Sequence, residues 1–285
     1  MSKLRLMGQN QWNCTNNQPK WEEKGLNCSA EHRMKGHIQI FKELMPDIVG
    51  GQEVNKDMQL YFMLLCQEEK LPYTMIWGNM TPIIYRADKF ELLDTEYLLY
   101  PKAMEGYEGS FNDSNSKACN LGVFRCKESG KVFIFVTTHL WWRNGNNPEY
   151  RFYQAGSNEA REYQLRLCVG LVDKYRAKYG DCPVVIAGDL NTGRGSLAHE
   201  FIEKEAGYTH AHDAAVEFAT EAIGYCSCNA EDPAPKWWDS SYEKADDHIY
   251  VKDMPEGAVK RFDRYCPDYY LALSDHAPVY IDVEF

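Results

Sequence analysis

Short apolar stretches, enriched in β-branched and aromatic residues, recur along the chain between clusters of turn residues. Stretches of this kind are typical of β-strands. The pattern predicts strands at residues 4–9, 47–52, 82–86, 90–93, 121–126, 132–138, 183–188, 248–252 and 278–284. The chain is therefore expected to be rich in sheet.

Apolar residues at helical spacing separate several of these strands and predict helices over residues 34–45 and 60–66. A longer helix is predicted between Ser157, a residue type that favours an N-cap, and Gly180, which suits the position after a helix C-terminus. A shorter helix is predicted to begin at Ser196.

The order of these elements indicates the architecture. Helices alternate with strands near the N-terminus, whereas residues 82–138 read as consecutive strands joined by turns. This order predicts an α/β protein in which helices cover mixed β-sheets. No linker, repeat or low-complexity run divides the sequence, so we expect a single domain over residues 1–285. Residues 94–120 and 225–244 read as long loops, which often carry function, and we expect both to wall a pocket.

Charge narrows the range of partners. The 285 residues include 31 Lys and Arg against 42 Asp and Glu, which gives a net charge of −11. Binders of long duplex DNA usually present a basic face, so an extended footprint on DNA is not expected. No apolar run approaches the ~20 residues that span a bilayer, and the N-terminus lacks the apolar core of a signal peptide. Together with ten cysteines that form no CxxC pair, these features predict a cytoplasmic protein with reduced thiols.

Polar residues suited to acid–base chemistry stand at the ends of the apolar strands, either just after a strand or just before one. The strand at residues 183–188 ends in Gly-Asp-Leu-Asn, so Asp189 and Asn191 point the same way from its end. Strand ends are more often closed by Gly, Pro or Ser, which makes a repeated polar ending informative. The other strand ends of this kind carry Asn10, Glu53, His139, Asp247 and the segment Ser274-Asp275-His276. We expect these side chains to gather at one site.

Taken in order, these segments resemble the endonuclease/exonuclease/phosphatase superfamily, which has the DNase-I-like fold. The pieces that are specific in combination are Gly188-Asp189-x-Asn191 and Ser274-Asp275-His276-x-Pro278. The shorter pieces are Asn10, Gln52-Glu53, Thr138-His139 and Asp247-x-Ile249. The resemblance covers about residues 4–284 and implies a four-layer α/β sandwich, in which two packed mixed β-sheets are flanked by helices.

The resemblance also implies a hydrolase that acts on phosphate esters with the help of a divalent metal ion. Glu53 is then the main metal ligand, with Asn10 and Asp275 nearby. Mg²⁺ suits such a site because it prefers oxygen ligands and binds through one or two carboxylates. Mn²⁺ is the alternative ion.

The remaining polar side chains are assigned by the resemblance to the phosphate and the attacking water. His139 and Asn191 are expected to bind phosphate oxygens, and Asp189 to orient or deprotonate the water. His276, oriented by Asp247, serves either as the general base or as a stabiliser of the developing charge. The sequence leaves the choice of base between Asp189 and His276 open.

The expected substrate is a phosphorylated small molecule or a short oligonucleotide, with a phosphodiester favoured over a monoester. Departures from the motifs of inositol polyphosphate phosphatases and abasic-site nucleases disfavour both of these subfamilies. Tandem tryptophans and nearby arginines offer stacking faces and positive charge. The residues predicted to bind substrate are Trp141, Trp142, Arg143 and Arg194. Loop packing is an equal alternative for Trp141 and Trp142, and the favoured one for Trp237-Trp238.

Three other interpretations remain beside the phosphoesterase. One is a nuclease that acts on short single-stranded nucleic acid, and another is a catalytically silent module that binds a phosphate ligand. A third is a zinc site built from His210, His212, Cys226 and Cys228. The one-residue gap between these cysteines is shorter than in usual structural zinc sites, which disfavours it.

Overall fold

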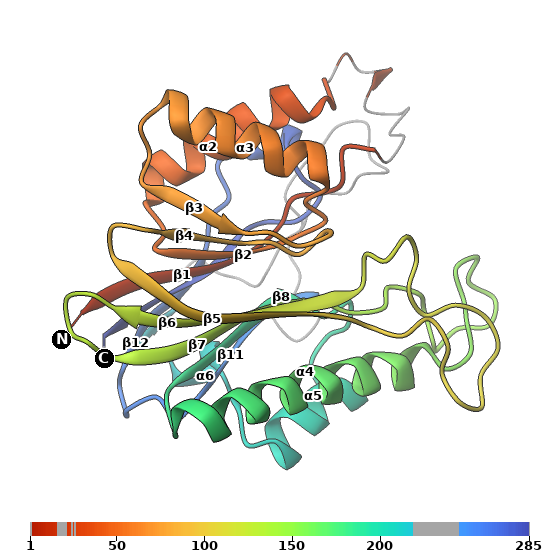
Figure 1. The fold of residues 1–285 in the computed structure, drawn as a ribbon. Helices are drawn as coiled ribbons and strands as arrows, with labels where there is room; N and C mark the ends of the chain where they lie inside the picture. The colour runs from red at the N-terminus through yellow and green to blue at the C-terminus, as the bar shows by residue number, and fades with distance from the viewer. Residues whose placement is uncertain (1, 16–21, 24, 26, 219–244, 285) are drawn as a thin grey trace.

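Two β-sheets pack face to face in the computed structural model, which describes residues 2–15, 22–23, 25, 27–218 and 245–284. Helices α2 (Ala30–Leu44) and α3 (Lys56–Glu68) cover the outer face of one sheet (Figure 1). Helices α4 (Ser157–Tyr179) and α5 (Leu197–Glu200) cover the outer face of the other. The four-layer α/β sandwich that the resemblance implied is therefore confirmed.

The first sheet has seven strands and contains both ends of the described chain. Their order is β10 (Glu217–Phe218), β12 (Val259–Arg264), β13 (Val279–Glu284), β1 (Lys3–Asn10), β2 (Ile48–Gln52), β4 (Ile83–Arg86) and β3 (Tyr73–Ile76). Strand β1 runs parallel to β2 and antiparallel to β13, so the sheet is mixed.

The second sheet has six strands. Their order is β5 (Phe90–Leu99), β6 (Ala118–Cys126), β7 (Val132–His139), β8 (Val184–Asp189), β11 (Asp247–Lys252) and β9 (Thr209–His210). Strands β7 and β8 are parallel and place His139 opposite Asp189. Strand β11 is antiparallel to β8 and places Asp247 opposite Asp189. Three predicted site residues are thus neighbours at one edge of this sheet.

Alternation along the strands builds separate apolar layers. In β1, Leu6 joins the core between the two sheets, whereas Met7 joins the layer beneath α2 and α3. Successive side chains of a strand point to opposite faces, so one strand contributes to both layers. Helix α2 begins after Ser29, whose hydroxyl accepts from the His32 N–H, and ends at Met45 in a left-handed conformation.

The nine predicted strands are all present, and several are longer than predicted. Strand β5 continues to Leu99 and β6 begins at Ala118, so the first predicted loop is shorter than 94–120. The pattern missed β3, β9, β10 and β12. Strand β12 reads Val-Lys-Arg-Phe-Asp-Arg, and β9 and β10 have two residues each, which leaves too little apolar signal.

The predicted helices are present, with shifted ends. Ser157 is the first residue of α4, and Gly156 occupies the N-cap in a left-handed conformation. Ser196 caps α5, which continues as a π-helical turn at Phe201–Glu205. The second predicted loop, at 225–244, lies outside the described residues. In the described part of the chain, no helix combines the length and apolar character needed to cross a bilayer.

Candidate active site

Close approach of the two sheets brings the predicted residues together. A Cβ on Gly50 would lie 2.7 Å from the Thr137 Cβ of the opposite sheet, a distance that real Cβ atoms do not reach. Across the same gap, Gln52 Nε2 donates to Thr137 Oγ1 at 2.7 Å. Glycine is needed here because any side chain would push the sheets apart. The polar ends of β1 and β2 therefore reach those of β7 and β8.

Asp189 is the centre of the site and is almost fully buried. Its Oδ2 accepts from Asn10 Nδ2 at 2.8 Å, a bond that joins the two sheets. Its Oδ1 accepts from the Asn191 backbone N–H at 2.9 Å, and Asn191 adopts a left-handed φ of 52° to make this contact. His139 Nε2 lies 3.5 Å from Asp189 Oδ2. Asn10 and Asn191 thus fix the position of the Asp189 carboxylate.

His276 faces Asp189 from the other side. Its Nδ1 lies 2.7 Å from Asp247 Oδ2, and its Nε2 lies 4.0 Å from Asp189 Oδ2. The Ser274 hydroxyl accepts from the His276 N–H and donates to the Asn10 carbonyl at 2.7 Å, which fixes this turn to β1. The predicted pairing of His276 with Asp247 is present.

The electrostatics of this pair favour a charged imidazole. Burial opposes the charge on His276, but the carboxylates of Asp247 and Asp189 outweigh it and hold the pKa of His276 well above its usual range. Burial raises the pKa of Asp247, an effect that His276 partly offsets. An imidazolium is a donor at both nitrogens, so His276 Nε2 is placed to donate a hydrogen bond into the site.

Glu53 and Asp275 lie on the side of the site where the resemblance puts the metal. Glu53 follows β2 with a left-handed φ of 56°, and its Oε2 accepts from the Asn13 N–H at 3.2 Å. Burial disfavours its charge, but His139, Lys117 and this N–H prevail and lower its pKa. Burial raises the pKa of Asp275 to about 7, and the nearby Glu53 adds to the shift. The Asp275 Oδ1 atom is buried and accepts no hydrogen bond from the described residues.

Lys117 is a site residue that sequence reasoning missed. It is 3% exposed, and its Nζ lies 2.5 Å from His139 Nε2. Burial lowers its pKa to about 8, although Glu53 and Asp189 favour the charged form. Lys117 directly precedes β6, so it also stands at a strand end. The signal was lost because that strand was predicted to begin three residues later, at residue 121.

The position of the Trp141 side chain does not support the predicted contact between this residue and the substrate. It is fully buried against Phe111, so neither face of its ring is open to a ligand. Its backbone N–H donates to Gln164 Oε1 at 2.8 Å, and its carbonyl accepts from Arg161 Nη1 at 3.0 Å. Trp141 therefore belongs to the packing that holds the loop after β7, which was the alternative interpretation.

Arg194 also differs from the prediction. Its guanidinium pairs with Asp213 at 2.8 Å and with Glu203 at 3.1 Å, so its charge is already balanced. Trp142 and Arg143, by contrast, border a cavity of about 390 Å³ that reaches Asn191. Arg143 lies over the Trp142 ring, 5.3 Å from its centroid. Trp142 and Arg143 are therefore placed for substrate contact, whereas Arg194 borders an adjoining cavity with its charge already paired.

A buried histidine cluster, formed by His199, His210 and His248, supports the loop that carries Asn191. His199 Nε2 and His248 Nε2 lie 3.0 and 3.1 Å from the Thr192 carbonyl oxygen. His210 Nε2 lies 3.0 Å from His248 Nδ1. Burial lowers the pKa of all three, that of His199 to about 4. His210 thus has a packing role here, while Cys226 and Cys228 of the zinc hypothesis lie outside the described residues.

Among the described residues, one group of three His, Cys, Asp or Glu side chains has its ligand atoms close enough to share a metal ion. It consists of Asp189, Asp247 and His276, whose atoms lie within 4.8 Å of one another. His276 Nδ1 and Asp247 Oδ2 are already engaged with each other at 2.7 Å. These three side chains are therefore better suited to acid–base chemistry than to binding a metal ion.

Comparison with known proteins gives the fold a name. No known family model matches the chain. Carbon catabolite repressor protein 4 homolog 3 of Arabidopsis thaliana is 24% identical over 177 residues, which are 60% of this chain and 35% of that relative. The chain thus spans much less than the length of this curated relative.

Solved structures match nearly the whole chain. An endonuclease/exonuclease/phosphatase from Bacteroides vulgatus is 22% identical, with a TM-score of 0.71 and 100% of each chain covered. A mannosyl-6-phosphatase of Bacteroides thetaiotaomicron is 18% identical, also with a TM-score of 0.71, and the match covers 99% of this chain and 100% of that one. The chain therefore has the DNase-I-like fold of the endonuclease/exonuclease/phosphatase superfamily, as its motifs indicated.

Proposed function

We propose that this protein is a Mg²⁺-dependent phosphoesterase that hydrolyses a phosphate ester of small size by attack of an activated water. One observation carries the proposal: the Asp189 carboxylate is held by Asn10 and Asn191 and faces His276, which Asp247 keeps charged. A fixed carboxylate opposite a fixed imidazolium suits a reaction that removes a proton from water while negative charge grows on phosphate.

The donor set fits a hard divalent cation. Glu53 and Asp275 supply carboxylate oxygens, and the buried Oδ1 of Asp275 lacks a hydrogen-bond donor among the described residues. Four acidic side chains, Glu53, Asp189, Asp247 and Asp275, gather at the site beside the basic side chains of Lys117, His139 and His276. Such an excess of carboxyl groups favours an ion that prefers oxygen ligands, such as Mg²⁺ or Mn²⁺. When bound, the ion neutralises phosphate charge and polarises the ester.

Asp189 is the better candidate for the general base. It accepts hydrogen bonds from Asn10 and Asn191, which position its carboxylate, whereas the imidazolium of His276 has no free lone pair to accept a proton. Asp189 thus takes the proton of the attacking water as the new P–O bond forms. The bond to the leaving oxygen breaks, and that oxygen leaves with the electron pair and is then protonated.

The positive groups are placed for the phosphate oxygens. His276 Nε2 points toward Asp189 rather than away from the site, and it donates to a nonbridging oxygen as charge develops. Lys117 adds a buried positive charge beside His139. A preorganised donor in a buried site stabilises such charge more than water does.

The fold neighbours support a phosphate ester, because one of them is named as a phosphatase that acts on a mannosyl phosphate. The test is turnover of p-nitrophenyl phosphate, bis-p-nitrophenyl phosphate, sugar phosphates and a short single-stranded oligonucleotide, each with Mg²⁺ and with EDTA. We expect metal-dependent hydrolysis of at least one of them, and a loss of about 10²–10³-fold in kcat for His276→Gln, which removes a charged donor from the phosphate oxygen.

Two outcomes decide against this proposal. Absence of metal-dependent turnover on every substrate, together with tight binding of a phosphate ligand, would identify the silent binding module instead. If the kcat of His276→Gln stays within tenfold of the wild-type value, the reaction does not depend on His276 and its proposed role is wrong. Preference for the oligonucleotide would favour the nuclease interpretation.

A further inference from the structure

Two adjoining cavities lie along the loop after β8, next to Asn191 of the site. The first, of about 390 Å³, includes Asn191 of the site and is bordered by Tyr150 and Phe152. The second, of about 530 Å³, shares Asn146 and the Thr192-Gly193 backbone with the first. A phosphate group needs much less room, so the cavities have space for the rest of a substrate molecule.

The aromatic side chains that border the first cavity, Trp142, Tyr150 and Phe152, favour contact with only one face of a bound ligand ring. Trp142 and Phe152 meet at 66° with ring centroids 5.1 Å apart, and Tyr150 meets Phe152 at 77° and 5.7 Å. Rings that meet edge to face leave no parallel slot in which a flat nucleobase is held between two faces. Tyr150 is 48% exposed, so one of its faces is open. A single open face suits the C–H surface of a sugar ring.

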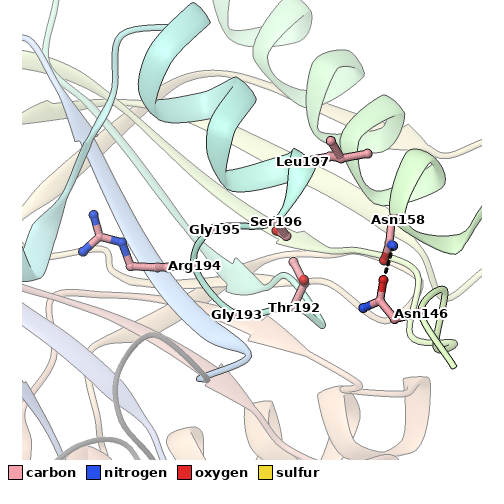
Figure 2. A pocket seen from close by; sticks show the side chains of 8 residues that line it. All are labelled: Asn146, Asn158, Thr192, Gly193, Arg194, Gly195, Ser196 and Leu197. Atoms are coloured by element: carbon pink, nitrogen blue, oxygen red, sulfur yellow. Dashed lines mark hydrogen bonds between the residues drawn. The ribbon is translucent and has the colours of Figure 1, made fainter.

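The polar wall combines donors with an acceptor. Asn146 Oδ1 accepts from Asn158 Nδ2 at 2.6 Å, while the Asn146 amide nitrogen has no acceptor among the described residues (Figure 2). Asn144 Oδ1 accepts from two backbone N–H groups, which leaves its amide nitrogen to donate. The Asp246 carboxylate is exposed at the rim and forms no ion pair within the described chain. Hydroxyl groups, which both donate and accept, match such a wall.

Two of the three arginines along the cavities, Arg161 and Arg194, are engaged within the protein, and the third, Arg143, lies over the Trp142 ring. Arg161 donates to the carbonyls of Trp141 and Arg143 at 3.0 and 2.8 Å. The side chain of Arg194 extends away from Asn146 and Asn158 (Figure 2) and pairs with Asp213. A chain of further phosphates would therefore meet Asp246 and a single arginine, Arg143, rather than a row of cations, which disfavours a polynucleotide.

We propose that these cavities bind the polyhydroxy part of a sugar or polyol phosphate, with the phosphate at Asp189 and a ring or carbon chain against Tyr150. The amides of Asn144 and Asn146 donate to its hydroxyl groups, and Asp246 accepts from them. This inference rests on the proposed function, because it names the substrate class of the same site.

The experiment compares kcat/KM for mannose 6-phosphate, glucose 6-phosphate, glycerol 3-phosphate, AMP and a thymidine dinucleotide, with p-nitrophenyl phosphate as the generic ester. We expect a sugar or polyol phosphate to exceed AMP and the dinucleotide. In Tyr150→Ala and Asn146→Ala, the ratio of its kcat/KM to that for p-nitrophenyl phosphate should fall by about tenfold or more. Tyr163→Ala is the matched control, because this tyrosine is 43% exposed on α4 and borders neither cavity.

Higher kcat/KM for AMP or the dinucleotide than for every sugar and polyol phosphate would overturn the inference, as would an unchanged ratio in both variants. If none of these phosphates is hydrolysed, p-nitrophenyl phosphate included, the proposed function fails, and calorimetric binding of the same phosphates then decides about the cavities. Binding of a sugar phosphate that Tyr150→Ala weakens by about tenfold supports the inference. No binding of any sugar or polyol phosphate contradicts it.

Discussion

The histidine cluster predicts that the folded state loses stability in mild acid. His199 is 1% exposed, and burial lowers its pKa from 6.5 to about 4. Its contact with the Thr192 carbonyl is compatible with a neutral ring that donates one proton. Below pH 6.5 the unfolded chain binds a proton at this histidine that the folded chain does not. Stability is therefore complete above that pH and falls as the pH drops toward 4.

The magnitude follows from the two pKa values. At pH 5, the difference in proton binding at His199 lowers the free energy of unfolding by about 2 kcal/mol relative to pH 8. His210 and His248, whose pKa values burial also lowers, add to this loss. The assay is urea denaturation between pH 5 and 8. In His199→Gln, whose amide keeps a donor for the Thr192 carbonyl, the loss between pH 8 and 5 should be smaller by about 2 kcal/mol.

The control is His32→Gln, because His32 is an exposed histidine on α2. The reasoning is refuted if His199→Gln loses as much stability between pH 8 and 5 as the wild type does. A variant that is less stable at every pH by the same amount would show lost packing alone. Only a changed dependence on pH reports on the protonation of the histidine.

Four further predictions concern the site and the sheet contact beneath it. Asp189→Asn should reduce kcat by about 10²–10⁴-fold while thermal melting still shows a folded protein, and a loss below tenfold would remove Asp189 from the base role. Lys117→Met should lower kcat/KM more than Lys117→Arg does, because only Arg keeps the charge; equal losses in steady-state assays would indicate packing. Glu53→Gln should raise the Mg²⁺ concentration needed for half-maximal activity, and an unchanged titration curve would contradict its ligand role. Gly50→Ala should lower the free energy of unfolding by about 1–3 kcal/mol in urea denaturation, because the new Cβ would clash with Thr137. An unchanged urea midpoint would show that the two sheets accommodate the methyl group.

Much of the fold was predictable because its strands are apolar and bounded by turn residues. The strands missed were either short, such as β3 with four residues and β9 with two, or rich in charge, such as β12 with four charged residues out of six. Hydrogen bonding to a neighbouring strand holds such segments in place, and that contribution leaves no trace in the local pattern. Order of the polar segments, rather than any one of them, pointed to the fold.

The site was predictable where its residues stand at the ends of predicted strands, and Lys117 was missed because β6 begins three residues earlier than predicted. Lys117 reaches His139 only because β6 and β7 pair in the observed register. Tandem aromatics are ambiguous in sequence: Trp141 is buried and Trp142 borders a cavity, although the two are adjacent. Arg194 was expected at the substrate, but Asp213 and Glu203 hold its charge.

The amino-acid sequence by itself determined which strands form and which polar residues end them, because both depend on the local order of apolar and turn residues. Tertiary structure decided which of these ends meet. Gly50 lets one sheet approach the other, and only then does Asn10 reach Asp189 at 2.8 Å. The charge state of His276 and the openness of the wall beside Asn191 likewise depend on neighbours distant in sequence. Distance and burial set electrostatic energies, and both exist only once the chain has folded.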